Sequence, residues 1–162
     1  MFDEEIIDLA KSLNSSERYT AIVDFSRPAD QHRFFLISTG NWTIDYSSFT
    51  SHGSGSGPRT DAREFGNIAN SLKSSKGIMK TGKTYYGKHG YSRKLIGLEE
   101  GINDQVFNRA IVLHPADYVS PSHVRTHGYP GRSWGCITLD PKKSEDIINL
   151  LQEGSLVYVH TK

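Results

Sequence analysis

The chain has 162 residues, and its 19 basic and 18 acidic side chains give a formal net charge of +1 at neutral pH. This length predicts one domain, residues 1–162, and the near-neutral charge argues against bulk electrostatic binding to nucleic acid or to an anionic membrane. A hydrophobic share of 36% is too high for a disordered chain. The single cysteine, Cys136, excludes an internal disulfide and a four-cysteine zinc site.

The N-terminal segment, residues 2–14, has the periodicity of an amphipathic helix, because Phe2, Ile6 and Leu9 recur at three- and four-residue steps. Acidic residues follow Phe2, where an export signal would be basic, and neither a long apolar stretch nor a transmembrane segment can be recognised. The sequence therefore predicts a cytoplasmic protein, or a periplasmic one if an export signal precedes this sequence.

Short β-prone runs follow, at residues 21–25, 33–37 and, more weakly, 42–49, with a turn at 39–41 between the last two. Residues 51–58 are rich in serine and glycine. Because neither flank is large enough for a comfortable core of its own, we expect this segment to be a loop that lines a cleft.

Residues 65–98 hold seven basic side chains and no aspartate or glutamate. Two interpretations are open: solvated loops and edge strands, or a local positive field that attracts an acidic ligand. The basic residues are Lys73, Lys76, Lys80, Lys83, Lys88, Arg93 and Lys94.

The C-terminal part contains one predicted helix and three predicted strands, at residues 109–114, 136–139 and 155–160. That helix is expected over residues 141–152, with Asp140 as its N-cap. Many short strands, two helices, glycine-rich turns and no strand–helix alternation predict a mainly β fold. We expect a sandwich or barrel with short peripheral helices.

Two interpretations of Cys136 are open: it is either a small buried hydrophobic residue or a nucleophile. The residues next to it in the sequence favour the nucleophile. Gly135 lets the backbone approach a ligand closely, and backbone N–H groups around such a turn can form an oxyanion hole to which Ser133 could add a hydroxyl. Arg132 supplies a positive charge that would bind a carboxylate and favour a thiolate.

A nucleophilic thiol needs a base, and His114 is the best candidate, at the end of a predicted strand and 22 positions before Cys136. The alternative for such a histidine is a purely structural role. Its second ring nitrogen needs an acceptor to fix the tautomer. Asp117 is the nearest acid but is not an obvious partner, so a backbone carbonyl is the other candidate.

Metal binding is the rival use of these side chains. Cys136 and His114 could form a zinc site with His123 and His127, which are four residues apart. Prolines bracket the latter pair, at positions 121 and 130, and the segment does not look helical. We therefore expect no metal and no cofactor.

Taken in order and spacing, several short motifs make the chain resemble the L,D-transpeptidase catalytic domain, the YkuD fold, in its murein L,D-transpeptidase branch. The resemblance covers the chain from Tyr19 to the C-terminus. The motifs that carry it are Val23–Ser26, Ser51–Gly53, Lys73–Gly77, Tyr85–Ser92, Gly97–Glu99, Gly101–Asn103, Arg109–His114 and Gly131–Cys136.

The resemblance implies that Cys136 is the nucleophile and His114 its base, with the backbone carbonyl of the next residue orienting the ring. That residue is Pro115, where the family usually has glycine. Thr138 stands where the wider family often has a basic or amide side chain. The expected substrate-binding side chains are Arg132, His52, His89, Tyr86 and Trp134.

The family's donor is a peptidoglycan stem tetrapeptide, whose terminal D-Ala is displaced through a thioester. From the plain N-terminus we expect a cytoplasmic L,D-carboxypeptidase that trims muropeptides with water. The alternatives are a periplasmic L,D-transpeptidase, which forms cross-links or exchanges D-amino acids, and a non-catalytic muropeptide-binding module. The expected partner is the stem peptide, with no nucleic acid and no membrane.

Overall fold

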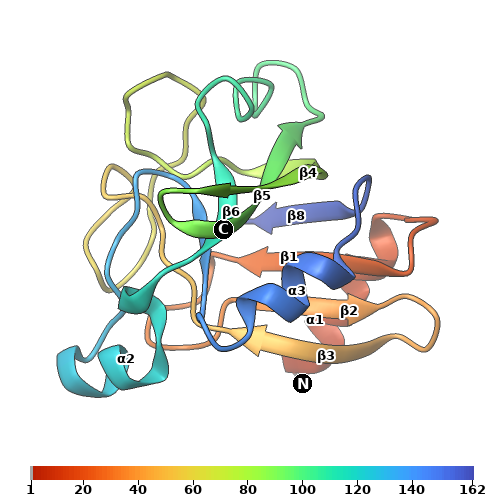
Figure 1. Ribbon diagram of the computed structural model, residues 1–162, viewed down its shortest axis with the longest axis horizontal. Coiled ribbons are helices and arrows are strands. Elements are labelled where there is room, and N and C mark those ends of the chain that lie inside the picture. The colour runs from red at the N-terminus through yellow and green to blue at the C-terminus, as the bar shows by residue number, and fades with distance from the viewer. Residues whose placement is uncertain (1) are drawn as a thin grey trace.

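A computed structural model describes residues 2–162, with side chains from Glu4 onward, and its framework is one eight-stranded mixed sheet (Figure 1). Phe2, which the sequence predicts on the apolar face of the first helix, falls outside the described side chains. The strands are β1 (Tyr19–Asp24), β2 (Phe34–Ser38), β3 (Thr43–Ser48), β4 (Gly77–Gly87), β5 (Gly90–Gly97), β6 (Val112–Pro115), β7 (Ile137–Leu139) and β8 (Leu156–His160). The helices are α1 (Phe2–Ser12), α2 (Pro121–His127) and α3 (Ser144–Leu150), with a short 3-10 turn, η1, at Asp117–Val119.

The strand order is β3-β2-β1-β8-β4-β5-β6-β7. The β1–β8 and β6–β7 pairs are parallel, and the other neighbours are antiparallel. The sheet curls into a nearly closed barrel, with short helices around it (Figure 1). The mainly β fold with short peripheral helices is therefore confirmed.

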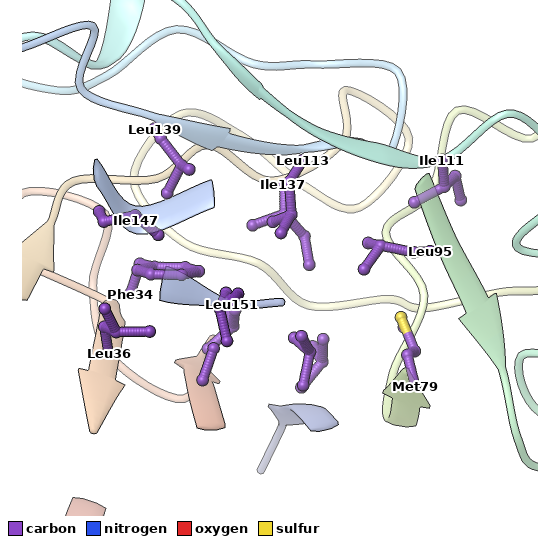
Figure 2. Close-up of a cluster of buried hydrophobic side chains, with 14 of the residues drawn as sticks. Phe34, Leu36, Met79, Leu95, Ile111, Leu113, Ile137, Leu139, Ile147 and Leu151 are labelled. Carbon is purple, nitrogen blue, oxygen red and sulfur yellow. The ribbon is translucent and has the colours of Figure 1, made fainter. Parts of the chain in front are cut away.

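The interior of the curled sheet is the main hydrophobic core (Figure 2). Alternation along each strand sends every second side chain inward, as at Leu113 in β6 and at Ile137 and Leu139 in β7. Helix α3 contributes Ile147 and Ile148 from its buried side. This packing fixes which face of β6 and β7 points inward, so it also fixes which side chains point the other way.

Helix α1 packs on the opposite face of the sheet (Figure 1). Its buried residues Ile6 and Ala10 contact the outward side chains Ile22 and Ile37 of β1 and β2. The predicted amphipathic helix is therefore confirmed, although it ends at Ser12, two residues before the expected end.

The two edge strands, β3 and β7, are joined by side-chain hydroxyls rather than by a backbone ladder. Ser48 Oγ accepts the Asp140 N–H at 3.1 Å, and Thr50 Oγ1 accepts the Thr138 N–H at 3.2 Å. Thr138 Oγ1 in turn accepts the Ser51 N–H at 2.9 Å. We call these three contacts the hydroxyl seam. It satisfies buried polar groups where the barrel closes.

Two helix predictions need correction. The C-terminal helix spans Ser144–Leu150 instead of residues 141–152, and its N-cap is Lys143 instead of Asp140. The Asp140 carboxylate accepts the Lys142 N–H and holds residues 141–143 as a turn. Residues 121–127 are helical, although the flanking prolines suggested otherwise. Pro121 occupies the first turn, where it costs no hydrogen bond, and the Ser120 hydroxyl caps the helix by accepting the His123 N–H.

Two further predictions also differ from the structure. The run 109–114 forms a strand only from Val112, and that strand continues to Pro115, next to the edge strand β7. The loop at 51–58 packs beneath the segment that carries Cys136, through a Gly53–Ser133 bridge, and does not line the cleft described below. Over residues 2–162, no helix has the length and apolarity that spanning a membrane requires.

Replacing Leu113 by alanine should lower the free energy of unfolding by about 2–5 kcal/mol, because the side chain is fully buried at the centre of the core. Urea denaturation measures this loss. The matched control is Leu98→Ala, since Leu98 is 47% exposed and should lose much less. Equal losses for the two variants would contradict the described core.

Candidate active site

Strands β6 and β7 bring His114 and Cys136 to one face of the sheet. The register pairs Leu113 with Ile137 and His114 with Thr138, and Cys136 directly precedes β7. Because Leu113 and Ile137 point into the core, the alternating positions His114 and Cys136 point away from it. The two residues that the sequence predicts as base and nucleophile therefore line the same cavity.

That cavity has a volume of about 530 Å³. Lysine and arginine side chains contribute to its wall, and none of its described lining residues is an aspartate or glutamate. Its lining includes Tyr85, Lys88, His89, Arg109, His114, Tyr118, Arg132, Ser133, Trp134 and Cys136.

The Cys136 thiol is held by the backbone of the segment that leads into β6. The Val112 N–H donates to Sγ at 3.4 Å, and the thiol lies 3.5 Å from the Ala110 carbonyl, which accepts its proton. Ala110 has a φ of 56°, a left-handed conformation that a non-glycine residue adopts only under constraint. Burial raises the pKa of the thiol above its ordinary value, and the Val112 N–H and the charges of Arg109 and Lys88 oppose that rise.

His114 is buried and keeps one tautomer. Its Nδ1 lies 2.7 Å from the Pro115 carbonyl, which can only accept, so Nδ1 carries the proton and Nε2 is left to exchange protons. Burial lowers the pKa of His114, with further lowering by His89 and Lys88. The exposed Asp117 makes no hydrogen bond with this ring among the described residues. At neutral pH the cavity therefore holds a thiol and a neutral imidazole.

The loop before Cys136 is tied by Ser133. Its hydroxyl donates to the Cys136 carbonyl at 2.9 Å and accepts the Gly135 N–H at 3.1 Å. Both groups are thereby used within the loop, so Ser133 and Gly135 do not offer the oxyanion donors that the sequence suggested. The Cys136 N–H finds no acceptor between residues 2 and 162, which leaves it as the donor beside Sγ. Gly135 has a φ of 120°, and a β-carbon there would meet the Lys73 carbonyl at 2.9 Å.

Arg109 is a site residue that motif reading missed. Its guanidinium lies in the cavity wall and donates to the Lys73 carbonyl at 2.8 Å and the Gly66 carbonyl at 2.9 Å. It thus ties down the loop on which Gly135 rests and also brings a positive charge near the thiol. The sequence marks it only as the first residue of the run that ends at His114.

His52 does not line the cleft, contrary to expectation. Its side chain is buried, Nδ1 accepts from Arg33 at 3.1 Å, and Nε2 donates to the Pro58 carbonyl at 2.6 Å. Burial and the Arg33 charge lower its pKa to about 4. Because the His52 carbonyl accepts the Ser133 N–H at 3.0 Å, His52 supports the loop that precedes Cys136.

Of the remaining residues that the sequence predicts to bind substrate, some line the cavity and one does not. Trp134 is 74% exposed and lines the cavity, as does Arg132, whose guanidinium donates to the Gly57 carbonyl at 3.0 Å. Tyr86 is 82% exposed and lies outside the lining, while its neighbour Tyr85 lies inside. Successive residues of a strand face opposite sides, so the two tyrosines cannot share the cleft.

The basic segment 65–98 is also divided between two roles. Lys88 lines the cavity, whereas Arg93 is buried and donates to the Ile148 and Gly82 carbonyls. His89 stands at the cavity wall with its ring stacked on His114. Part of the segment therefore adds positive charge to the cleft, and part of it is structural.

The alternative zinc site is not assembled. His123 and His127 stack on each other on α2, with ring centroids 4.1 Å apart, and neither lines the cavity that holds Cys136 and His114. Among the side chains that the structure describes, no group of three or more histidine, cysteine or acidic residues is placed to hold a metal ion.

Comparison with known families adds one match that spans almost the whole chain. The family model described as the L,D-transpeptidase catalytic domain (YkuD_2) matches residues 1–160. No curated protein matches the chain.

Solved structures show the same fold at low sequence identity. An L,D-transpeptidase from Mycobacterium smegmatis is 15% identical with a TM-score of 0.53, covering 89% of this chain and 59% of its own. An L,D-transpeptidase from Stackebrandtia nassauensis is 15% identical at 0.52, covering 91% and 58%. The helical cell shape determining protein Pgp2 from Campylobacter jejuni is 16% identical at 0.55, covering 96% and 55%. The chain thus spans less than two thirds of these structures.

Stability should fall as the pH drops from 6.5 toward about 4, because the unfolded chain then binds a proton at His52 that the folded chain excludes. Urea denaturation at several pH values measures the slope. The variant His52→Gln should flatten it in part, since the lowered pKa of His114 acts in the same direction. An unchanged slope would contradict the described burial of His52.

Removing the charge of Arg109 should raise the pKa of Cys136, because that charge opposes the effect of burial. The variants to compare are Arg109→Gln and Arg109→Lys. Both lose the guanidinium hydrogen bonds to the Gly66 and Lys73 carbonyls, but only lysine keeps the positive charge. The rate of thiol alkylation by iodoacetamide, measured against pH, gives the apparent pKa of Cys136. We expect a higher apparent pKa in the glutamine variant than in the lysine variant. Equal values in the two variants would refute the electrostatic role of Arg109.

Proposed function

This chain belongs to the L,D-transpeptidase catalytic domain family, and we propose that it is a cysteine acyl-transfer enzyme that removes the terminal D-Ala from peptidoglycan stem tetrapeptides. The observation that carries the proposal is the pairing of Cys136 with His114 in one cavity, with Nδ1 of His114 tied to the Pro115 carbonyl. Such a pair is the arrangement that nucleophilic catalysis by a thiol requires.

The first half-reaction uses the free Nε2 of His114. It takes the thiol proton as Sγ attacks the carbonyl carbon that precedes the D-Ala, and the Cys136 N–H stabilises the resulting oxyanion. When the intermediate collapses, the C–N bond breaks and His114 returns the proton to the leaving amine. D-Ala departs and a thioester on Cys136 remains. The neutral state of both groups suits this scheme, since the base must be unprotonated at the start.

In the second half-reaction, His114 takes a proton from water as the water oxygen attacks the thioester carbonyl. Collapse breaks the C–S bond, and the thiolate recovers the proton from His114. The product is a tripeptide with a new carboxylate, so the net reaction is hydrolysis. Free muropeptides fit this reaction as substrates. The cytoplasmic location expected from the sequence stays a prediction.

The charge of the cleft supports water as the acceptor. Lys88, Arg109 and Arg132 line it, and none of its described lining residues is acidic. A stem peptide carries carboxylates and is attracted by such a field, whereas an acceptor amine, mostly protonated near neutral pH, is repelled. Water carries no charge and meets no such barrier.

One observation favours a second candidate, transfer to an amine in cross-linking or D-amino-acid exchange. A second cavity of about 300 Å³ adjoins the first and shares Tyr85 and residues 110–112 with it. It is mostly apolar, with Lys94 over the rings of Tyr85 and Phe107. A two-lobed cleft offers room for an acceptor beside the nucleophile.

Incubation with disaccharide tetrapeptide, followed by mass spectrometry, tests the proposal. We expect loss of one alanine without dimer formation, and a rate at least about a thousandfold lower in Cys136→Ala, because the covalent intermediate cannot form. His127→Ala, an exposed histidine on α2 outside the cleft, is the control and should keep the wild-type rate.

The alternatives give other products. Dimer formation, or exchange with added D-amino acid without net hydrolysis, would establish the amine as acceptor. Binding of the tetrapeptide without turnover would indicate a non-catalytic module. Unchanged turnover in Cys136→Ala would remove the cysteine from the mechanism.

A further inference from the structure

The tip of the β4–β5 hairpin lies over His114. The two strands pair as far as Gly87 and Gly90, so the turn consists of Lys88 and His89 alone. Gly90 has a φ of 92°, a backbone conformation that permits so tight a turn. Both turn residues line the cavity that contains Cys136 and His114. This turn is therefore part of the cleft wall, although its side chains are exposed to solvent.

The ring of His89 covers one face of the His114 ring. The centroids are 4.1 Å apart and the planes differ by 12°, which is a stacked pair. His114 is already restrained at its edge, because Nδ1 donates to the Pro115 carbonyl. The stack adds a restraint on rotation out of the ring plane, which a single hydrogen bond leaves free. What remains open is the edge that carries Nε2.

Two more contacts hold the turn in place. The Lys88 ammonium lies 6.0 Å from the ring centroid of Trp134, on the loop that leads to Cys136. On the other side, a β-carbon on Gly90 would lie 3.8 Å from Cγ of Pro115. The turn is thus seated between the residue that orients the base and the loop of the nucleophile.

We propose that His89 is a positioning residue that holds the imidazole of His114 in its reactive orientation by ring stacking. It does not exchange protons with the substrate; it acts through His114. The proposal rests on the proposed function only in taking His114 as the base. A positioning role also explains why the hairpin ends in a two-residue turn, since a longer, looser turn would not fix the ring of His89 over its partner.

This role differs from that of a substrate contact, and the difference is visible without substrate. A stacked ring that orders His114 affects the free enzyme, whereas a substrate contact affects only the complex. The charged and titratable groups that line the same cavity as the two histidines are Tyr85, Lys88, Arg109, Tyr118, Arg132 and Cys136. The variants below change none of these groups.

The test compares His89→Ala and His89→Gln, which remove the flat ring, with His89→Phe, which keeps it. Lys83→Ala, an exposed position on β4 outside the cavity, is the matched control on the hairpin. Two measurements are made on free protein: the NMR resonance of the His114 Nδ1–H, and the rate of Cys136 alkylation by iodoacetamide. Thermal denaturation of each variant checks that it is folded.

In wild type, His89→Phe and Lys83→Ala, we expect a resolved Nδ1–H resonance that exchanges slowly. In the alanine and glutamine variants the resonance should be lost to exchange, and alkylation at neutral pH should slow by about tenfold to a hundredfold, as for a misplaced catalytic group. Neither measurement uses peptidoglycan, so the result is independent of the proposed substrate.

Three outcomes would overturn the proposal. An Nδ1–H resonance and an alkylation rate that are unchanged in the alanine and glutamine variants would show that His114 needs no stacked partner. A phenylalanine variant as impaired as the alanine variant would show that a flat ring is not what matters. In the tetrapeptide assay described under the proposed function, a rise in KM alone, with an unchanged spectrum of the free enzyme, would make His89 a substrate contact.

Discussion

The hydroxyl seam holds β7, the strand that follows Cys136, in its place at the closure of the barrel. Strand β7 has three residues and a backbone ladder on one side only, with β6. On its other side, Thr50 and Ser51 reach Thr138, and Ser48 reaches the N–H of Asp140. Without these bonds, the strand after Cys136 would be an edge that pairs on one side alone. The parallel register that brings Cys136 and His114 to one cavity therefore depends on three buried hydroxyls as well as on the core beneath it.

Burial and backbone contacts set the resting state of the reactive pair. Removal from water works against charge on both groups, raising the pKa of Cys136 and lowering that of His114. The nearby cations offset this only for the thiol, since positive charge favours a thiolate and disfavours an imidazolium. Arg109 and Lys88 therefore lower the pKa of the thiol and offset part of the effect of burial. A chain with a net charge of +1 can in this way hold a cleft lined by cations.

The sequence predicts the framework well because alternation and turn chemistry are local. The strands around Ile22, Phe35 and Val157 follow from short β-prone runs, and the predicted pair of Cys136 and His114 shares one cavity. What local patterns miss is set by contacts between distant segments. Hydrogen bonds with Arg33 and the Pro58 carbonyl hold His52 away from the cleft. A hydrogen bond to a carbonyl about 40 positions earlier in the chain holds Arg109 in the cleft wall. Whether Tyr85 or Tyr86 faces the cleft depends on which side of β4 each residue lies. A β-bulge between Thr81 and Thr84 shifts that alternation, and a local pattern does not reveal it.

The seam has a further effect on how an extended peptide can be held. Many proteins that bind such peptides add them as an extra strand to a free sheet edge, where main-chain groups supply most of the affinity. Here the outer side of β7, the strand next to the nucleophile, is already occupied by the hydroxyls of segment 48–51. A ligand entering beside Cys136 cannot extend the sheet at that point. Recognition of such a ligand therefore depends on side chains, which distinguish carboxylates and stereochemistry that a backbone ladder does not. Because this edge of the sheet is occupied, it also offers neighbouring molecules no free strand for edge-to-edge aggregation.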